Sequence, residues 1–283
     1  MILSGMIRNI YNPDPFITPQ PVNVTEKNGE AFFEFLGVKT LAEARALDAF
    51  YIRDKYAEFA QTHPRMAIAI DGKFCIDEPL KLWARGHFAN VPVMAGNTVD
   101  EFPGHIIADS AEELEAKAKE LFGEDAGAFL AFEQAKIKTE IGYAPLNVVE
   151  SSVKATFLEK QKVNDKDCFY YRFNPDIPGW DNPGSFHSVD LWFFFETLGM
   201  CWRPFKGRHF DLARIMCNYW TNFVKTGNPN GDDADGTAMP EWKPYTDEAR
   251  NEMQFLSEGA VPSMEDDDFM TFMVGLVQKD LEK

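Results

Sequence analysis

Short apolar or β-prone runs alternate with helical stretches along the chain, and this alternation constrains the fold most. The clearest helix is predicted over residues 211–225, where apolar side chains recur at helical spacing on one face and Gly227 follows as a stop signal. Strands are predicted over 91–96, 169–173 and 252–256. Strands that alternate with helices favour the α/β class, with a mostly parallel sheet covered by helices on both faces.

Composition and charge exclude several kinds of protein. Of 283 residues, 45% are hydrophobic, with 25 Phe and 6 Trp, which excludes a disordered chain. A net charge of −17 leaves no basic surface for phosphate backbones, so we expect no nucleic-acid partner. No apolar run reaches the length of a membrane span, so we expect no membrane partner. The four scattered cysteines indicate free, mostly buried thiols and a cytoplasmic location.

The first candidate site residue is Glu101, which follows the apolar strand predicted over residues 91–96. A strand that ends in Gly96 and is followed by Asp100 and Glu101 places carboxylates at the carboxyl edge of a parallel sheet. Open α/β folds have their sites at that edge. The alternative interpretation is a solvated acidic loop.

The second candidate is His187, which lies in a loop rich in Gly and Pro before an aromatic run over residues 192–195. A histidine held there could act as a general base near neutral pH. The alternative is a structural histidine that caps the following helix. The other four histidines lie in ordinary polar or helical contexts, and we assign them no role.

The sequence lacks the motifs of a metal site, a nucleotide-binding loop and a nucleophile elbow. The histidines are isolated and the cysteines unpaired, so we expect no metal site. No glycine-rich nucleotide loop occurs, so we expect no cofactor. No serine has the Gly-x-Ser-x-Gly context of a nucleophile elbow. The acidic run over residues 266–268 is interpreted as the solvated start of a terminal helix predicted over 263–282.

Several of these segments together resemble the type-B carboxylesterase and cholinesterase family. The most specific are the run Tyr-Trp-Thr-Asn-Phe-Val-Lys-Thr-Gly-Asn-Pro-Asn-Gly and the Trp-Lys-Pro-Tyr that follows it. The acid and histidine segments also match. The four matching segments, in chain order, are 91–101, 184–190, 219–231 and 242–245.

The resemblance implies an α/β-hydrolase fold that comprises the C-terminal half of the sheet with its flanking helices, the N-terminal half being missing. It implies a single partial domain over residues 1–283, with a peripheral terminal helix within 257–283. It also implies roles for individual residues: Glu101 would orient His187. Ser4 and Asp190 would hold the acid and histidine in place without contacting the substrate. Phe102 departs from the family pattern, which has Gly directly after the acid.

The expected function is therefore that of a C-terminal portion of a carboxylic-ester hydrolase, a serine esterase whose nucleophile and oxyanion hole lie upstream. Such a chain is expected to be inactive alone. Expected partners are a small carboxylic-ester substrate in the complete enzyme, and either the missing N-terminal half or a second copy of the chain. The alternative is a non-catalytic, esterase-like module that binds proteins.

Overall fold

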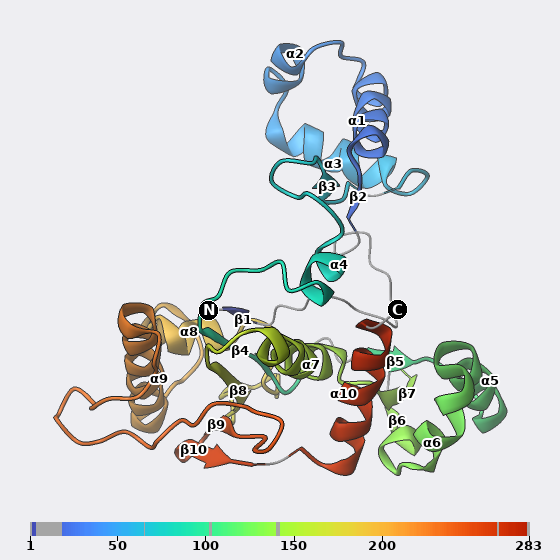
Figure 1. The fold of residues 1–283 in the computed structure, drawn as a ribbon. Coiled ribbons are helices and arrows are strands. Elements are labelled where there is room, and N and C mark those ends of the chain that lie inside the picture. Colours follow the sequence, from blue (N-terminus) through green and yellow to red (C-terminus); the bar gives the residue numbers. More distant parts are fainter. Residues whose placement is uncertain are drawn as a thin grey trace. The chain divides into compact units, whose positions relative to one another are not determined.

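A computed structural model describes residues 2–3, 19–64, 66–101, 104–139, 142–264 and 266–281, and the chain divides into two compact units (Figure 1). Unit 1 comprises residues 1–11 and 86–283, and unit 2 comprises residues 12–85. The single partial domain over residues 1–283 stays a prediction. Both candidate site residues lie in unit 1.

The centre of unit 1 is a five-stranded sheet with the order β1-β4-β8-β9-β10. The first four strands in this order are parallel to one another, and β10 is antiparallel to β9. The predicted mostly parallel sheet is confirmed. The strands are β1 (Ile2–Leu3), β4 (Val93–Thr98), β8 (Cys168–Asn174), β9 (Glu252–Leu256) and β10 (Gly259–Ser263).

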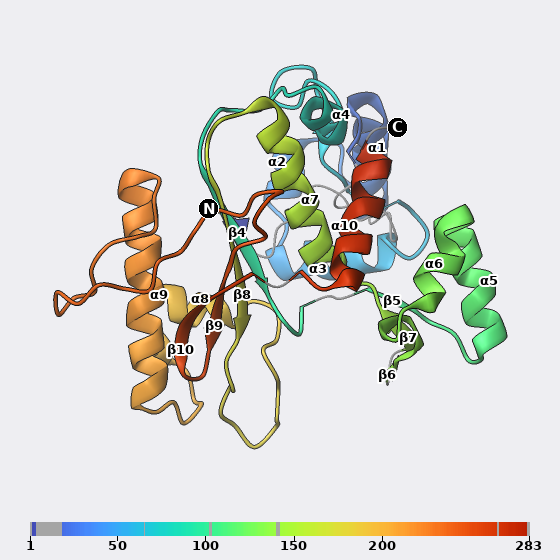
Figure 2. The same ribbon diagram turned by 60° about the horizontal axis from the view of Figure 1, so that its bottom comes forward.

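Helices cover both faces of this sheet, as Figure 2 shows for the region around β8. Phe169 of β8 contacts Phe223 of α9 (Gly207–Thr226), with ring centroids 6.1 Å apart. The next residue along the strand, Tyr170, contacts Phe157 of α7 (Val148–Val163) at 6.5 Å. Successive strand residues point to opposite faces, so the aromatic run of β8 is buried on both sides.

Helix α9 confirms the helix predicted over 211–225 and begins four residues earlier, at Gly207. Gly227 has a left-handed backbone with φ of 80°, and its N–H donates to the carbonyl of Phe223. Glycine adopts that conformation without the steric cost of a Cβ atom, so the sequence ends the helix here.

The terminal helix α10 (Asp268–Leu281) packs against α7. Its residues Phe269 and Met273 join the hydrophobic cluster that also contains Phe129, and the peripheral terminal helix within 257–283 stays a prediction. The sequence analysis did not predict α7. Three of its buried residues, Glu150, Lys154 and Lys160, are charged and obscure an amphipathic pattern.

The rest of unit 1 includes a small antiparallel sheet in the order β5-β7-β6, and further short helices. These elements are β5 (His105–Ile106), α5 (Ala111–Phe122), η1 (Gly123–Asp125), α6 (Ala126–Ala131), η2 (Gln134–Lys136), β6 (Lys138–Thr139), β7 (Gly142–Pro145), α8 (Asp190–Phe194) and η3 (Leu198–Met200).

Unit 2 is mainly helical and has its own small core of Phe32, Leu36 and Phe59. The rings of Phe32 and Phe59 lie 5.1 Å apart. Its elements are β2 (Gln20–Pro21), which pairs in parallel with β3 (Ala69–Ile70), and the helices α1 (Val22–Leu36), α2 (Leu41–Arg45), α3 (Ala49–Phe59) and α4 (Pro79–Ala84).

Candidate active site

The candidate site lies at the carboxyl edge of the five-stranded sheet. Strands β4 and β8 are parallel neighbours, so the loops that follow them leave the sheet on the same side. Glu101 follows β4, and His187 lies in the loop between β8 and α8. A bridge between Asp100 and Phe186 joins the two loops directly beside the site.

The structure brings the two predicted residues into contact, since Nδ1 of His187 and Oε1 of Glu101 share a hydrogen bond. The side chain of Glu101 is only 3% exposed, whereas that of His187 is 43% exposed. The second carboxylate oxygen of Glu101 accepts a hydrogen bond of 3.1 Å from the hydroxyl of Thr98, the last residue of β4. Glu101 is therefore a buried and oriented acid rather than part of a solvated loop.

This hydrogen bond determines which nitrogen of His187 can accept a proton. With Nδ1–H donating to the carboxylate of Glu101, Nε2 is the nitrogen that can accept a proton. His187 also precedes α8 by only three residues, as the capping alternative requires, but the N-cap residue of α8 is Val189. The imidazole thus contacts a buried acid and is partly open to solvent, an arrangement that general-base chemistry would require.

Asp190 lies at the first position of α8 and is fully buried. Its Oδ2 accepts a hydrogen bond of 2.8 Å from the hydroxyl of Tyr171, and no donor among the described residues reaches its Oδ1. Burial raises the pKa of Asp190, the hydrogen bond from Tyr171 opposes that rise, and the charge of Glu101 adds to it. Its supporting role stays a prediction.

Two residues named in the sequence analysis lie outside the described residues: Ser4, the other predicted supporting residue, and Phe102, which replaces the family's glycine. Sequence reasoning placed Asp100 at this edge of the sheet but missed Thr98 and Tyr171 as neighbours of the site. The alternation along β8 could have placed Tyr171 on one face, but no local pattern pairs it with Asp190.

Ser185, two residues before His187, is buried and its hydroxyl is already hydrogen-bonded. Ser185 is 2% exposed, and its hydroxyl donates a hydrogen bond of 2.9 Å to the carbonyl of Pro175. Among the described residues, no group of three or more His, Cys, Asp or Glu is placed to hold a metal ion. In the same part of the chain, no helix combines the length and apolarity that crossing a bilayer requires.

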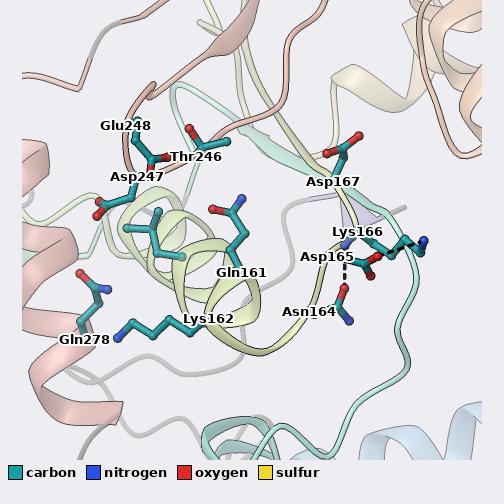
Figure 3. Close-up of a pocket in the computed structure, with 11 residues that line it drawn as sticks. Gln161, Lys162, Asn164, Asp165, Lys166, Asp167, Thr246, Asp247, Glu248 and Gln278 are labelled. Atoms are coloured by element: carbon teal, nitrogen blue, oxygen red, sulfur yellow. Dashed lines mark hydrogen bonds and ion pairs between the residues drawn. The ribbon is translucent and has the colours of Figure 1, made fainter.

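A separate polar pocket of about 410 Å³ lies near the amino end of β8 (Figure 3). Asn164, Asp165, Lys166 and Asp167, which precede β8, form part of its wall. Because Glu101 and His187 follow the carboxyl ends of their strands, this pocket belongs to the other end of the sheet. Its lining includes both acidic and basic side chains, and it does not contain the predicted acid and histidine.

The fold is that of the α/β-hydrolases. A solved thermophilic PNB esterase superposes with a TM-score of 0.61 at 20% identity, covering 92% of this chain and 55% of that one. A second PNB esterase structure gives a TM-score of 0.64 at 18% identity, covering 90% of this chain and 54% of that one. The chain therefore spans about half of each of these solved structures.

Sequence comparison finds similarity to one family of enzymes. Residues 146–271 match the model described as "Carboxylesterase family". Para-nitrobenzyl esterase of Bacillus subtilis is 26% identical over 207 residues, which is 67% of this chain and 39% of that protein. Human bile salt-activated lipase is 31% identical over 91 residues, or 32% of this chain and 11% of that protein. The chain is thus similar to para-nitrobenzyl esterase over 67% of its length, and its residues 146–271 are similar to the carboxylesterase family that the motifs resemble.

Proposed function

We propose that this chain contributes the acid, Glu101, and the base, His187, of a Ser–Glu–His triad in a carboxylic-ester hydrolase. The observation that supports the proposal best is the hydrogen bond between the buried carboxylate and the partly exposed imidazole at the carboxyl edge of the sheet. The family resemblance adds the order acid before histidine, with the serine preceding both.

In this proposal Glu101 holds the imidazole by its Nδ1–H and stabilises the imidazolium that forms during the reaction. Nε2 of His187 takes the proton from a serine hydroxyl as the serine oxygen attacks the ester carbonyl. His187 then donates that proton to the departing alcohol. The serine and the N–H groups that bind the oxyanion belong to the N-terminal half of the fold, which this sequence does not contain.

The partner proposal concerns the edge of the sheet. Within the described residues, β1 is an edge strand of the five-stranded sheet, because it pairs with β4 alone. An unpaired edge exposes backbone N–H and C=O groups that can bind another strand. We propose that the N-terminal half of the hydrolase completes the sheet there and that, without it, the chain self-associates; the substrate of the complete enzyme is a small carboxylic ester.

A fusion tests the function directly. The part of Bacillus subtilis para-nitrobenzyl esterase that precedes its region of similarity is joined to Met1, and hydrolysis of p-nitrophenyl acetate is measured. We expect turnover in the fusion, sensitive to a serine-directed phosphonate, and background rates for the chain alone. Replacing His187 with Gln should lower kcat of the fusion by at least about 10³-fold, because the base acts together with the serine.

Three results would contradict the proposal. Fast, phosphonate-sensitive turnover by the isolated chain would show that it contains its own nucleophile. Full activity of H187Q would remove the histidine from the mechanism. A folded, monodisperse fusion without turnover would favour the alternative, a non-catalytic esterase-like module that binds proteins.

A further inference from the structure

Two hydrogen bonds between Asp100 and Ser185 connect the loop of the acid with the loop of the histidine. The Ser185 N–H donates a hydrogen bond of 2.7 Å to Oδ2 of Asp100. In the other direction, the Asp100 N–H donates one of 3.2 Å to the carbonyl of Ser185. We call this pair of hydrogen bonds the Asp100–Ser185 link.

Gly184 makes room for this link. Its φ of +62° lies in the left-handed region, and a Cβ atom there would lie 2.3 Å from Oδ2 of Asp100. A side chain at position 184 would therefore be strained and would push the carboxylate off the Ser185 N–H. A further hydrogen bond holds Ser185 in place: its buried hydroxyl donates to the carbonyl of Pro175, the residue directly after β8.

The Asp100–Ser185 link lies close in the chain to both Glu101 and His187, so it affects how these two side chains meet. Asp100 directly precedes Glu101, and Ser185 precedes His187 by two residues. The link therefore fixes the separation of the two backbone segments from which the acid and the imidazole extend. Asp100 is itself exposed, and its carboxylate binds the backbone N–H of Ser185.

We infer that Asp100 is a positioning residue, whose carboxylate holds the histidine loop in the register at which His187 meets Glu101. This inference rests on the proposed function, since it assigns a second carboxylate to the same acid–histidine pair. Asp100 acts through the backbone of Ser185 and takes no part in proton transfer.

Proton NMR of the isolated chain provides the first test, because it needs no nucleophile. A histidine N–H bound to a carboxylate gives a resonance far downfield of the amide protons, and its loss in H187Q assigns it to His187. We expect this resonance in the wild-type chain and in D100N, whose side-chain oxygen can still accept from Ser185. We expect it to be broadened or lost in D100A and G184A, while circular dichroism stays unchanged.

The fusion provides the second test. D100A should lower kcat on the order of 100-fold with little change in KM, because the imidazole is displaced from the serine rather than removed. D100N should recover most of the activity. D109A, which removes another exposed carboxylate of unit 1, serves as the matched control and should match the wild type in both tests.

The outcomes separate this inference from the proposed function. A downfield resonance that persists in both D100A and G184A would overturn the positioning role and leave the acid–histidine pair intact. Absence of that resonance from the wild-type chain would overturn the pair, and with it the positioning role. Loss of the overall fold in both variants would also overturn the inference, because Asp100 would then support unit 1 as a whole.

Discussion

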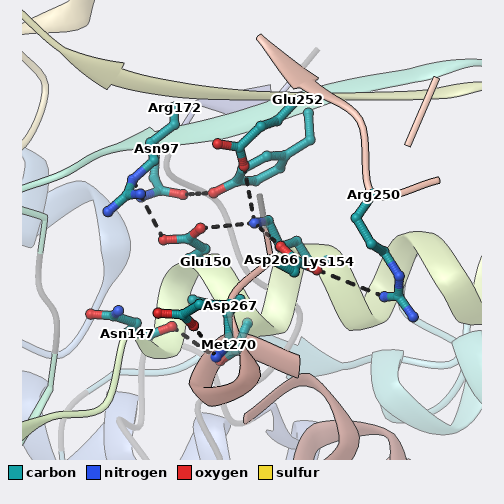
Figure 4. A network of polar contacts seen from close by, with 12 residues as sticks. Asn97, Asn147, Glu150, Lys154, Arg172, Arg250, Glu252, Asp266, Asp267 and Met270 are labelled. Atoms are coloured by element: carbon teal, nitrogen blue, oxygen red, sulfur yellow. Dashed lines mark hydrogen bonds and ion pairs between the residues drawn. The ribbon is translucent and has the colours of Figure 1, made fainter. Parts of the chain in front are cut away.

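Two clusters in unit 1 place a basic side chain against carboxylates, and they differ in access to solvent. His187 is 43% exposed beside one buried acid, Glu101. Lys154 of α7 is fully buried among three carboxylates, as Figure 4 shows. Its Nζ lies 2.9 Å from Glu150 and 3.1 Å from Glu252, and it also contacts Asp266.

The difference teaches that contact between a base and a carboxylate does not by itself identify a catalytic site. Burial alone would lower the pKa of Lys154, but Glu150, Glu252 and Asp266 outweigh burial and raise it above its usual value. Lys154 therefore keeps its proton and joins α7 to β9 and to the segment before α10. His187 contacts one buried acid and is partly exposed to solvent, as the proposed role of a general base requires.

The largest effect is expected from Lys154→Met. The substitution leaves three buried carboxylates without their shared cation, so the free energy of unfolding should fall by about 3 to 5 kcal/mol. Urea titration followed by tryptophan fluorescence measures this loss. The signal reports mainly on unit 1, because only Trp83 of the 6 tryptophans lies in unit 2, residues 12–85.

The matched control for Lys154→Met is Lys117→Met. Lys117 pairs with Glu113 at 2.8 Å on the exposed side of α5, with 42% of its side chain exposed. Loss of this surface pair should cost less than about 1 kcal/mol. Equal costs for the two variants would mean that the Lys154 cluster is no more buried in solution than a surface pair.

His187→Gln should have a smaller effect on stability. It removes one hydrogen bond to Glu101 from a partly exposed ring, so the isolated chain should lose about 1 kcal/mol of unfolding free energy. The same titration measures it. A loss as large as that of Lys154→Met would make His187 a structural residue and weaken the contrast between the two clusters.

The smallest effect is expected from Asp190→Asn, and it depends on pH. Burial raises the pKa of Asp190 above its ordinary value of 3.8, so above that pH the folded chain holds a proton that the unfolded chain has released. The contribution of Asp190 to the stability of the wild type therefore falls as pH rises through the interval between the two pKa values. Asparagine has no such proton, so the stability of D190N relative to wild type should increase with pH across this interval.

Urea titrations of both proteins at several pH values measure this difference. Glu252, whose pKa burial also raises, is present in both proteins and does not affect the comparison. A difference that stays constant with pH would mean that Asp190 is not buried as the structure describes.

Local sequence patterns correctly predicted those helices and strands whose buried positions are occupied mainly by apolar residues. The strand predicted over 252–256 is β9, and the helix predicted over 211–225 lies within α9. The pattern failed at α7, because its buried charges are compensated by distant residues such as Glu252 and Asp266. For the same reason the interpretation of residues 266–268 as solvated is wrong for Asp266, whose side chain is 2% exposed.

The sequence by itself determined the α/β class and the family resemblance, and it named Glu101 and His187 as the candidate acid and histidine, because short motifs and periodicities are local properties. Only the tertiary structure decided that Glu101 is buried while His187 stays accessible, that Asp100 binds Ser185, and that Lys154 has three acidic neighbours. Those contacts join residues far apart in the chain, and burial, which determines what each charge can do, depends on all of the elements packed around it.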